Sequence, residues 1–460
     1  MATAASPLAE ADFATRYAQH LLAQLQAGPL HSAAAPPGLQ RHPAIAWAQS
    51  GLMPLCGEPE GAPQLCPLPL PSCADAALAA LAQLSGAAAL RGFSGAQLLS
   101  ERAALMQLTR GGAISAGGAC HLLDTREGGI ALSLPREEDW ELLPAWLQDG
   151  QAVDVGDWSA LQARLVLQAR DELLERAQLL GLACAADVDA ASQAVPWLRV
   201  LHGAPLHGVN APRRPPRVLE LASLWAGPLC GHLLQLAGAE VVKLESWQRP
   251  DGARRGNRDF YDLLNAGKRS VALDFASREG RAQLRALIAH ADIVIEGSRP
   301  RALRQLGIVA EELLAEQPRL SWIAISAYGR SAEQELRIGY GDDVGVGAGL
   351  SAIQAQACGQ RMFIGDAIAD PLAGLHAALA AWASHASGGG RLIEVSLCGV
   401  LRHIVESARL PEAAAWRERY VRWMAAAGTP ATPVPRRAPA LAAALGADTQ
   451  SLLRDWAVPC

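Results

Sequence analysis

The sequence lacks the cysteine spacing of a metal site or a disulfide framework. Its 460 residues include nine cysteines, an odd number, and none of them forms a C-x-x-C pair. A zinc site or a disulfide scaffold would need close pairs or an even, regular set. The cysteines therefore indicate reduced thiols in a cytoplasmic protein, and no metal ligands are predicted.

Long apolar runs are also missing. The most apolar stretch, from Pro371 to Ala383, has 13 residues and contains His376, whereas a membrane-spanning helix needs about 20. Glu10 and Asp12 lie where a signal peptide would need an apolar core. We therefore expect a protein that does not act in or on a membrane.

The chain has no strong excess of one charge. Its 40 basic and 45 acidic residues give a formal net charge of -5 and are spread along the chain. Nucleic-acid binding would need a clustered basic face, so that function is not expected. Hydrophobic residues make up 50% of the chain, enough for sizeable cores, and the length suggests two or more domains.

Two proline-rich segments suggest where the chain divides. Residues 211–216 read APRRPP, and a second such stretch runs over 429–439. Proline lacks an N–H donor and disfavours helix, so the first segment is expected to be an extended, exposed linker. The division that follows is an N-terminal block over 1–210, a central domain over 217–410, and a C-terminal tail over 411–460.

The central domain alternates short apolar runs with helical stretches. This pattern predicts an α/β fold, with a Rossmann-like open parallel sheet and crossover helices. Ligands of such sheets bind at the carboxyl ends of the strands, here near residues 223–227, 245–246, 296–299 and 326–328. The expected strands are 217–221, 240–245, 270–274, 292–295, 320–326 and 391–397.

The N-terminal block shows a different pattern. Residues 117–134 contain two apolar runs around a polar turn, which predicts a β-hairpin. Helical stretches flank it at 76–84 and 160–180. This block is therefore expected to add an α+β unit to the main sheet.

Six segments of the central domain follow one another in a recognisable order. They include an opening strand with its AGP turn and a K-x-E strand, then an N-x-x-KRS-x-x-LD segment. The segments are 218–245, 265–281, 291–308, 318–329, 365–380 and 388–401. Together, rather than singly, they resemble the CaiB/BaiF family, the family III CoA-transferases.

Parts of the N-terminal block and the tail resemble the same family, but out of order. Residues 50–63 are similar to the segment before the family's catalytic aspartate, and 117–134 to its small-domain hairpin. The tail at 445–456 is similar to the terminal motif, with Asp448 where histidine is usual. The resemblance implies a degenerate partial copy fused to a second copy. Family members form interlocked dimers, so a homodimer or an intramolecular pseudo-dimer is expected.

Asp370 matches the family's catalytic aspartate. A carboxylate can attack a thioester, form a mixed anhydride and then accept CoA as a thioester. Because Pro371 suits the first turn of a helix, Asp370 is also a candidate N-cap without catalytic role. Asp366 ranks second as nucleophile. The first copy offers only Ser72 or Asp75 at the equivalent place, so it is expected to be structural.

The CoA-binding residues that the resemblance implies follow several strands of the sheet. Two positions depart from the family: Ser246 and Gln305 stand where relatives have arginine, and Arg249, Arg254, Arg255 or Arg258 would have to replace them. The residues implied are Trp225, Ala226, Gly227, Leu273, Asp274, Gly297, Ser298, Arg299, Arg304 and Tyr328.

The function that this resemblance implies is transfer of CoA between an acyl-CoA and a small carboxylic acid. The intermediates would be an aspartyl anhydride and an aspartyl thioester, with CoA as part of the substrate and no permanent cofactor. One alternative is an acyl-CoA racemase or isomerase of the same family. It is disfavoured because Tyr340 stands where racemases have histidine. The other is a non-catalytic acyl-CoA-binding scaffold.

Overall fold

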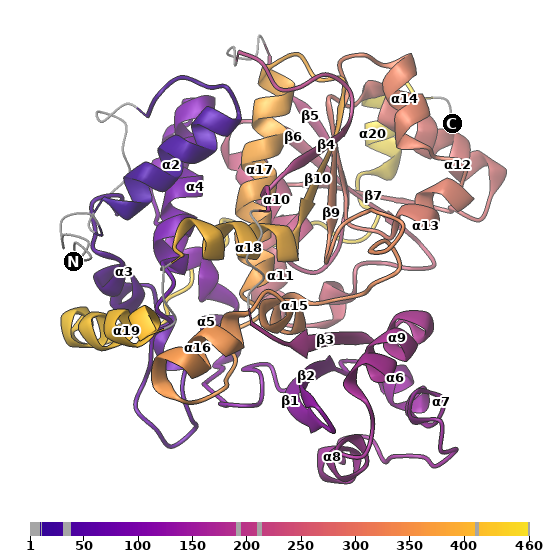
Figure 1. Cartoon of the computed structure of the whole chain (residues 1–460). Coiled ribbons are helices and arrows are strands. Elements are labelled where there is room, and N and C mark those ends of the chain that lie inside the picture. The colour runs from indigo at the N-terminus through magenta and orange to yellow at the C-terminus, as the bar shows by residue number, and fades with distance from the viewer. Residues whose placement is uncertain are drawn as a thin grey trace.

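A seven-stranded sheet is the largest element of the computed structural model, which describes residues 10, 12–30, 38–189, 195–208, 214–409 and 414–458. Most strands of this sheet are labelled in Figure 1. Their order in the sheet is β4-β10-β9-β8-β5-β6-β7. All neighbours are parallel except β4 and β10. The strands are β4 (Arg199–His202), β5 (Arg217–Leu221), β6 (Glu240–Ser246), β7 (Arg269–Leu273), β8 (Ile293–Glu296), β9 (Ser321–Ser326) and β10 (Arg391–Ser396).

The expected strands of the central domain are confirmed, each with its ends within one residue of the prediction. They are apolar without alternation because both faces of the sheet are covered by helices. In β8, for example, Ile293, Val294 and Ile295 are all fully buried. The predicted α/β class with a mostly parallel sheet is therefore confirmed.

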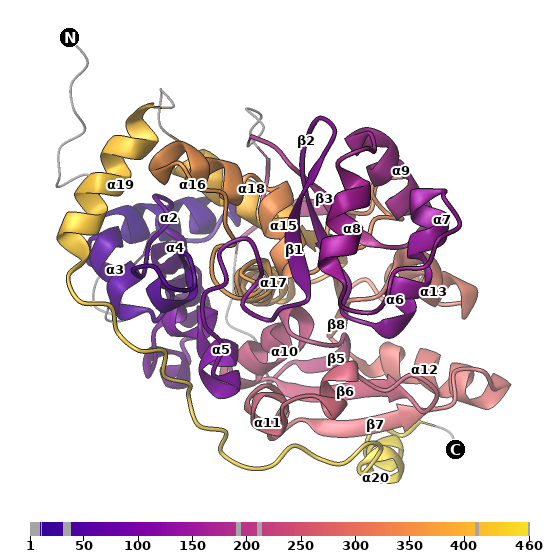
Figure 2. The same cartoon turned by 90° about the horizontal axis from the view of Figure 1, so that it is seen from below.

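Helices cover both faces of this sheet (Figure 2). One face packs against α10 (Ala226–Leu236) and α17 (Ala369–Ala386). The opposite face packs against α12 (Arg278–His290) and α14 (Ala310–Glu316), and α20 (Thr449–Asp455) lies against the edge strand β7. The other described helices of residues 214–458 are α11 (Arg258–Asn265), α13 (Pro300–Gln305), α15 (Gly341–Gly347), α16 (Leu350–Cys358), α18 (Leu397–Ser407) and α19 (Ala414–Ala427).

The first helices of the chain form a further layer over α17. Helix α4 (Leu70–Ser85) packs against α17, and α2 (Phe13–Gln24) packs against α4. The α17 helix is therefore enclosed on both sides, and its His376 is fully buried with Nε2 3.1 Å from the Tyr17 hydroxyl oxygen. The remaining helices of this layer are α3 (Pro43–Gln49) and α5 (Glu101–Met106).

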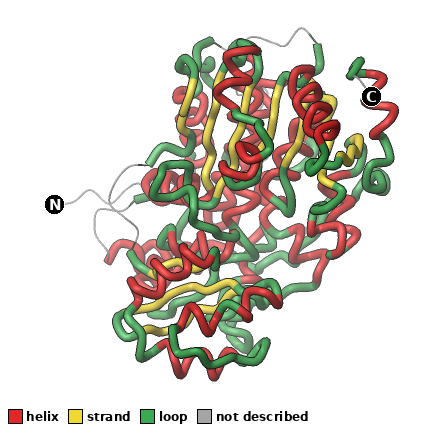
Figure 3. Tube along the Cα trace, turned by 90° about the vertical axis from the view of Figure 1, so that its right-hand side faces the viewer, coloured by secondary structure: helices red, strands yellow, loops and turns green. Residues whose placement is uncertain are grey.

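A separate three-stranded antiparallel sheet lies beside the large one (Figure 3). It contains β1 (Cys120–Thr125) and β2 (Gly128–Ser133), the hairpin expected within 117–134, and β3 (Ala183–Asp187). One face packs against α15. The other carries a small core with α6 (Glu137–Glu141), α7 (Leu143–Leu147), α8 (Trp158–Leu165) and α9 (Arg170–Leu180).

The single helix predicted over 160–180 is wrong, because the chain breaks between α8 and α9. Residues 166–169 between the two helices are not helical, and the carbonyl of Gln168 accepts a hydrogen bond from the backbone N–H of Arg126 in the hairpin turn, at 3.0 Å. A long-range contact therefore overrides the local helical pattern.

The chain does not keep its predicted blocks apart in space. Strand β4 comes from the predicted block 1–210 but pairs with β10 in the large sheet. Of the predicted linker 211–216, residues 211–213 lie outside the described part of the chain, and Arg214 and Pro215 are exposed. The division of the chain into domains remains a prediction.

The second proline-rich segment forms an extended strap that leads from α19 to α20 across the surface (Figure 2). Its Arg436 binds Glu101 of α5 in a bidentate pair, with Nε–Oε1 2.6 Å and Nη2–Oε2 3.0 Å. The Arg436 guanidinium also stacks over Phe93 and contacts the His232 ring nitrogen Nε2 at 3.0 Å. The strap thus ties the N-terminal helices to α10.

Replacing Arg436 with methionine is expected to lower the free energy of unfolding by about 3–5 kcal/mol, because Glu101 would be left buried without its partner. Chemical denaturation monitored by circular dichroism measures this. The control is Arg285→Met, which breaks an exposed pair with Glu316 and should cost less than about 1 kcal/mol. Equal losses in the two variants would contradict a structural role for the strap.

Candidate active site

The candidate site lies where α10 and α17 both begin. Each helix follows or precedes a strand of the parallel sheet, so both helix starts lie at the carboxyl edge of the strands, where such sheets bind ligands. Asp370 is the second residue of α17. It is mostly buried but retains some exposure to solvent.

The carboxyl group of Asp370 is held close to backbone. Burial raises the pKa of Asp370 to about 7, while Arg102 and the backbone N–H groups of Ala226 and Gly341 act to lower it. A Cβ at Gly341 would lie 2.4 Å from Asp370 Oδ2, so only glycine allows this approach. Asp370 is therefore a carboxylate that titrates near neutral pH.

Two further carboxylates lie beside Asp370. Oδ1 of Asp366 accepts a hydrogen bond from Nη1 of Arg102 at 2.5 Å, and Oδ1 of Asp342 accepts one from the Ala367 N–H at 2.8 Å. The second oxygen of Asp366 is buried without a partner among the described residues. Burial, and for Asp342 also the charge of Asp366, raises the pKa of both carboxyl groups.

A fourth carboxylate, Asp343, joins the site to the small sheet. Its Oδ1 accepts hydrogen bonds from the Tyr340 N–H at 2.8 Å and from the Ser133 hydroxyl of β2 at 3.0 Å. Its Oδ2 accepts one from the Tyr328 hydroxyl at 3.4 Å. Burial raises the pKa of Asp343 to about 7.

The cation of this cluster comes from the N-terminal block. Arg102 of α5 pairs with Asp366 and lies over the indole of Trp225, 5.8 Å from the ring centroid. A Cβ placed on Gly117 would be 3.5 Å from the Arg102 guanidinium and 3.9 Å from Asp366. Residues far apart in the sequence therefore enclose one site.

Two residues with an unfavourable backbone conformation lie at the same place. Leu224 (φ 69°) and Ala367 (φ 42°) are non-glycine residues in the left-handed region. Leu224 precedes the start of α10, and Ala367 lies between the two aspartates at the start of α17. Such conformations cost free energy and persist only where surrounding contacts hold them, which is typical of functional sites.

The predicted site residues fall into four groups. Ala226 lies at Asp370, and Trp225 lies beneath Arg102. Tyr328 and Arg299 border the site: the guanidinium of Arg337 lies 3.5 Å from the Tyr328 ring centroid, and Arg299 lies near the small sheet at Gly181. Gly227 and Gly297 both pack against Ala222, next to the loop that precedes α10.

The remaining predicted residues do not reach Asp370. Leu273 is a buried residue at the end of β7, two strands beyond β5, and the Asp274 carboxylate accepts a hydrogen bond from Gln248 at 2.6 Å. Arg304 pairs with Glu311, and Ser298 donates to Glu296.

Two of the arginines offered as replacements for missing CoA contacts are already engaged. Arg254 binds Glu245 and Arg258 binds Asp262. Both therefore have carboxylate partners within the chain, so they are poor candidates for the phosphates of CoA.

The first copy offers no matching nucleophile. The Asp75 Oδ1 accepts hydrogen bonds from the Ser94 hydroxyl at 2.6 Å and from the Ala96 N–H at 3.0 Å, so this carboxylate holds a neighbouring turn. Ser72 is 1% exposed, and its hydroxyl has no partner among the described residues. Both residues lie inside α4, beneath the surface.

Sequence reasoning did not identify Arg102 or Asp342 as site residues. No local motif marks Arg102, because its partner Asp366 is 264 positions away. Within the described residues, no group of three or more His, Cys, Asp or Glu side chains has the arrangement of a metal site. No helix in that part of the chain is long and apolar enough to cross a membrane.

Two cavities among the described residues lie away from Asp370. One, of about 710 Å³, lies between α2 and α18 and is lined by Tyr17, His20 and His403. The other, of about 320 Å³, lies between α9 and the segment after β9, at Tyr328 and Arg337. Asp370 lines neither of these two cavities.

These features define an α/β protein with a titratable carboxylate at the carboxyl edge of its sheet. Residues 216–432 match the model of CoA-transferase family III. This match supports the resemblance found in the central part of the sequence. The partial copy in the N-terminal block remains a prediction.

Relatives of known activity match the same half of the chain. A succinyl-CoA–D-citramalate CoA-transferase of Chloroflexus aurantiacus is 33% identical over 217 residues, 44% of this chain and 54% of the relative. A succinate–glutarate CoA-transferase of Agrobacterium fabrum is 33% identical over 209 residues, 41% and 52% of the two chains. An alpha-methylacyl-CoA racemase of Mus musculus is 37% identical over 115 residues, 25% and 28%.

The chain spans about half the length of the curated CoA-transferases it matches. Among solved structures, a CAIB/BAIF family protein from Brucella suis is 29% identical with a TM-score of 0.38. That match covers 43% of this chain and 56% of the other.

Replacing Asp342 with asparagine is expected to stabilise the protein at pH 8 and to have little effect at pH 4. A carboxyl group whose folded pKa is raised binds its proton more tightly in the folded state, so its contribution to stability is lost as pH rises through the folded pKa. Asparagine keeps the Oδ1 that accepts from Ala367. Thermal unfolding at both pH values measures the difference. A uniform loss of stability at both would contradict the burial argument.

Proposed function

We propose that the chain transfers CoA between an acyl-CoA and a small carboxylic acid, with Asp370 as the nucleophile. The observation that carries the proposal is the setting of this one carboxylate, between the helix starts of α10 and α17 with Arg102 nearby. Asp366 is a weaker candidate, because it is fully buried and paired with Arg102.

The proposed reaction uses the carboxylate twice. An Asp370 oxygen attacks the thioester carbonyl, the carbon–sulfur bond breaks, and a mixed anhydride and CoA thiolate form. The thiolate then attacks the Asp370 carbonyl of the anhydride, which releases the first carboxylic acid as its anion and leaves an aspartyl thioester. The acceptor carboxylate repeats these two steps in reverse order, and Asp370 is regenerated.

The residues around Asp370 have separate parts in this scheme. The N–H groups of Ala226 and Gly341 are donors near the attacked carbonyl, where negative charge develops. The positive charge of Arg102 favours the ionised, nucleophilic form of Asp370.

CoA itself is proposed to lie along the carboxyl edge towards the small sheet. Arg299 is exposed there and has the guanidiniums of Arg301 and Arg136 in its electrostatic surroundings. Burial lowers the pKa of Arg299 most, and the charges of Arg301 and Arg136 lower it further. Such an excess of positive charge is suited to phosphate groups. CoA enters as part of the substrate, and the scheme needs no permanent cofactor.

The N-terminal block is proposed to complete the site within one chain. It supplies Arg102 to Asp366 and Ser133 to Asp343. The fused layout would thus provide what a second subunit supplies in the interlocked dimers that the family resemblance implied.

Asp370→Asn is expected to abolish a covalent mark that the parent acquires from an acyl-CoA and hydroxylamine, because the amide cannot form the anhydride. Mass spectrometry of the peptide containing residue 370 detects the hydroxamate. Asp366→Asn is the matched control, since it changes a neighbouring carboxylate, and it should keep the mark. A mark that survives in Asp370→Asn, or its absence in the parent, would rule out this nucleophile.

The rate of CoA transfer is expected to rise with pH through a midpoint near 7, since only ionised Asp370 attacks. Arg102→Met should move this midpoint to higher pH, because the lost charge no longer favours the carboxylate. Arg102→Lys, which keeps the charge, should stay closer to the parent. Stopped assays of acyl-CoA formation across pH 5–9 measure the midpoint. A shift to lower pH in Arg102→Met would refute the assigned role.

The alternative of racemization has one relative in its favour but a poorly suited residue in this chain. Burial, as the largest effect, raises the pKa of Tyr340, so this phenol stays protonated near neutrality and cannot accept the substrate proton. Incorporation of solvent deuterium at the carbon next to the thioester, without CoA exchange, would favour the racemase. Binding of acyl-CoA with neither mark nor exchange would favour a scaffold.

A further inference from the structure

The loop before α10 is held from beneath by buried side chains. Nζ of Lys243 donates to the Ala222 carbonyl at 3.0 Å, and Oδ1 of Asp251 accepts from the Leu224 N–H at 3.0 Å. Nζ of Lys268 donates to the Pro228 carbonyl at 2.8 Å. These three contacts hold both ends and the middle of residues 222–228. This segment, called the loop below, consists of the connection before α10 and the first residues of that helix.

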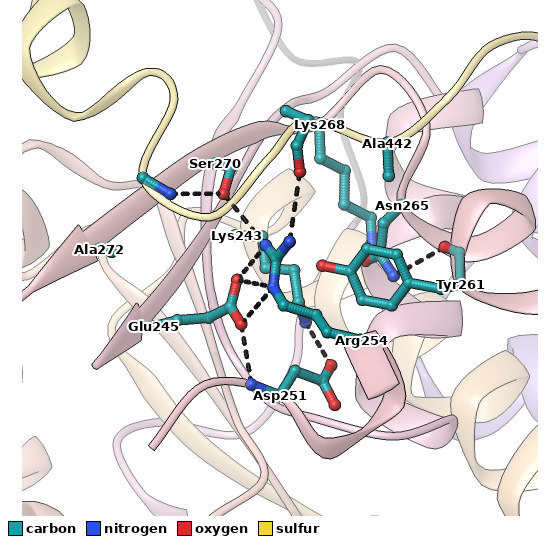
Figure 4. Close-up of polar contacts among 12 residues, drawn as sticks. Lys243, Glu245, Asp251, Arg254, Tyr261, Asn265, Lys268, Ser270, Ala272 and Ala442 are labelled. Atoms are coloured by element: carbon teal, nitrogen blue, oxygen red, sulfur yellow. Dashed lines mark hydrogen bonds and ion pairs between the residues drawn. The ribbon is translucent and has the colours of Figure 1, made fainter. Parts of the chain in front are cut away.

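The three side chains belong to one ion network with Glu220. Lys243 lies 3.1 Å from Glu220 and 2.9 Å from Asp251, and Lys268 lies 2.7 Å from the other Glu220 oxygen. All four residues are at most 5% exposed. Figure 4 shows Lys243 directed towards Asp251, with Glu245 joined to Arg254 and to the Asp251 backbone.

The network is charge-balanced only as a unit. Glu220 and Asp251 raise the pKa of Lys243 although burial alone would lower it. Burial lowers the pKa of Lys268 to about 8. Breaking a buried ion pair is costly, and hydrophobic replacements are often no less stable. Stability alone therefore gives little reason for two lysines here, which points to a role in fixing geometry.

What the network fixes is the strained part of the site. Leu224 has φ 69°, and its N–H is held by Asp251. The next two residues are Trp225, beneath Arg102, and Ala226, whose N–H acts on Asp370. If the loop relaxed, both contacts would move away from the carboxylate.

We propose that Lys243, Lys268, Glu220 and Asp251 are positioning residues for Asp370, which act through the strained loop 222–228. The proposal rests on the proposed function only for its consequence in catalysis. Its direct consequence is physical. These four residues form a clamp on the loop, and without the clamp the Ala226 N–H and Arg102 stabilise the Asp370 carboxylate less. The other charged groups that face Asp370 are Asp366 and, on α15, Asp342 and Asp343; none of the proposed substitutions changes them.

Charge and geometry predict opposite results at one position. Lys268→Met removes a positive charge and a loop contact, and both changes raise the pKa of Asp370. Asp251→Ala removes a negative charge, which alone would lower the pKa of Asp370, but it also frees the Leu224 N–H, which should raise it. Asp251→Asn keeps an oxygen for the Leu224 N–H but loses the charge and the Oδ2 that pairs with Lys243.

The experiment titrates Asp370 directly by NMR of full-length protein labelled with 13C at the aspartate carboxyl. The Asp370 signal is assigned by its absence from Asp370→Asn. We expect the midpoint to rise by about one pH unit in Lys268→Met and Asp251→Ala, and to stay at or below the parent value in Asp251→Asn. Circular dichroism verifies that each variant is folded, and Asp251→Ala and Asp251→Asn decide the matter if Lys268→Met does not fold.

Arg391→Met is the matched control. Arg391 is also a buried cation that binds backbone carbonyls of the same sheet, those of Ala204, Pro205 and Gly389, but it does not touch the loop. An equal rise in Arg391→Met, or a fall or no change in Asp251→Ala, would overturn the proposal. Neither result depends on turnover. Absence of the hydroxylamine mark would therefore contradict the proposed function, whereas the titration would still test the clamp.

Discussion

The burial of carboxylates at the start of α17 is the constraint on which the site depends. Asp342, Asp366 and Asp370 lie together there, and all have raised pKa values. Such a group must be protonated or must find donors and positive charge. Helix starts and one arginine provide these donors, and the surrounding elements keep them in place. The site is therefore tuned to change its protonation near neutral pH, where a carboxylate nucleophile must be ionised yet poorly solvated.

This constraint also explains why the N-terminal block is part of the site. Residues of α15 and the start of α17 supply the aspartates, but Arg102, the cation paired with Asp366, comes from α5. In the N-terminal block, Asp75 accepts hydrogen bonds from Ser94 and Ala96, so it holds a turn. The same block packs against α17 through α4 and against α15 through the small sheet.

The strands could be predicted from the sequence because a buried strand depends on a local pattern, such as the apolar run of β8. Asp370 was predicted from the family resemblance, because its local pattern fits a helix N-cap equally well, and its role remains a prediction. Arg102 could not be found this way, since only folding brings it to Asp366. The helix over 160–180 failed for the same reason, because the carbonyl of Gln168 bonds to Arg126 across the chain. Arg254 looked available for phosphate until folding paired it with Glu245.

The strap and the segment that follows it contact two regions near Asp370: the helix that carries Arg102, and the surroundings of the ion network under the loop. Arg436 binds Glu101, whose neighbour in α5 is Arg102, so the strap bears on the cation of the site. Further along, the Ala443 carbonyl accepts from Arg254, and the Gly446 N–H donates to Ser270, beside the ion network under the loop. The same segment thus contacts the helix that carries the cation and the surroundings of the clamp that fixes the N–H donor. A tail remote in sequence from Asp370 therefore packs against elements that adjoin the surroundings of this carboxylate.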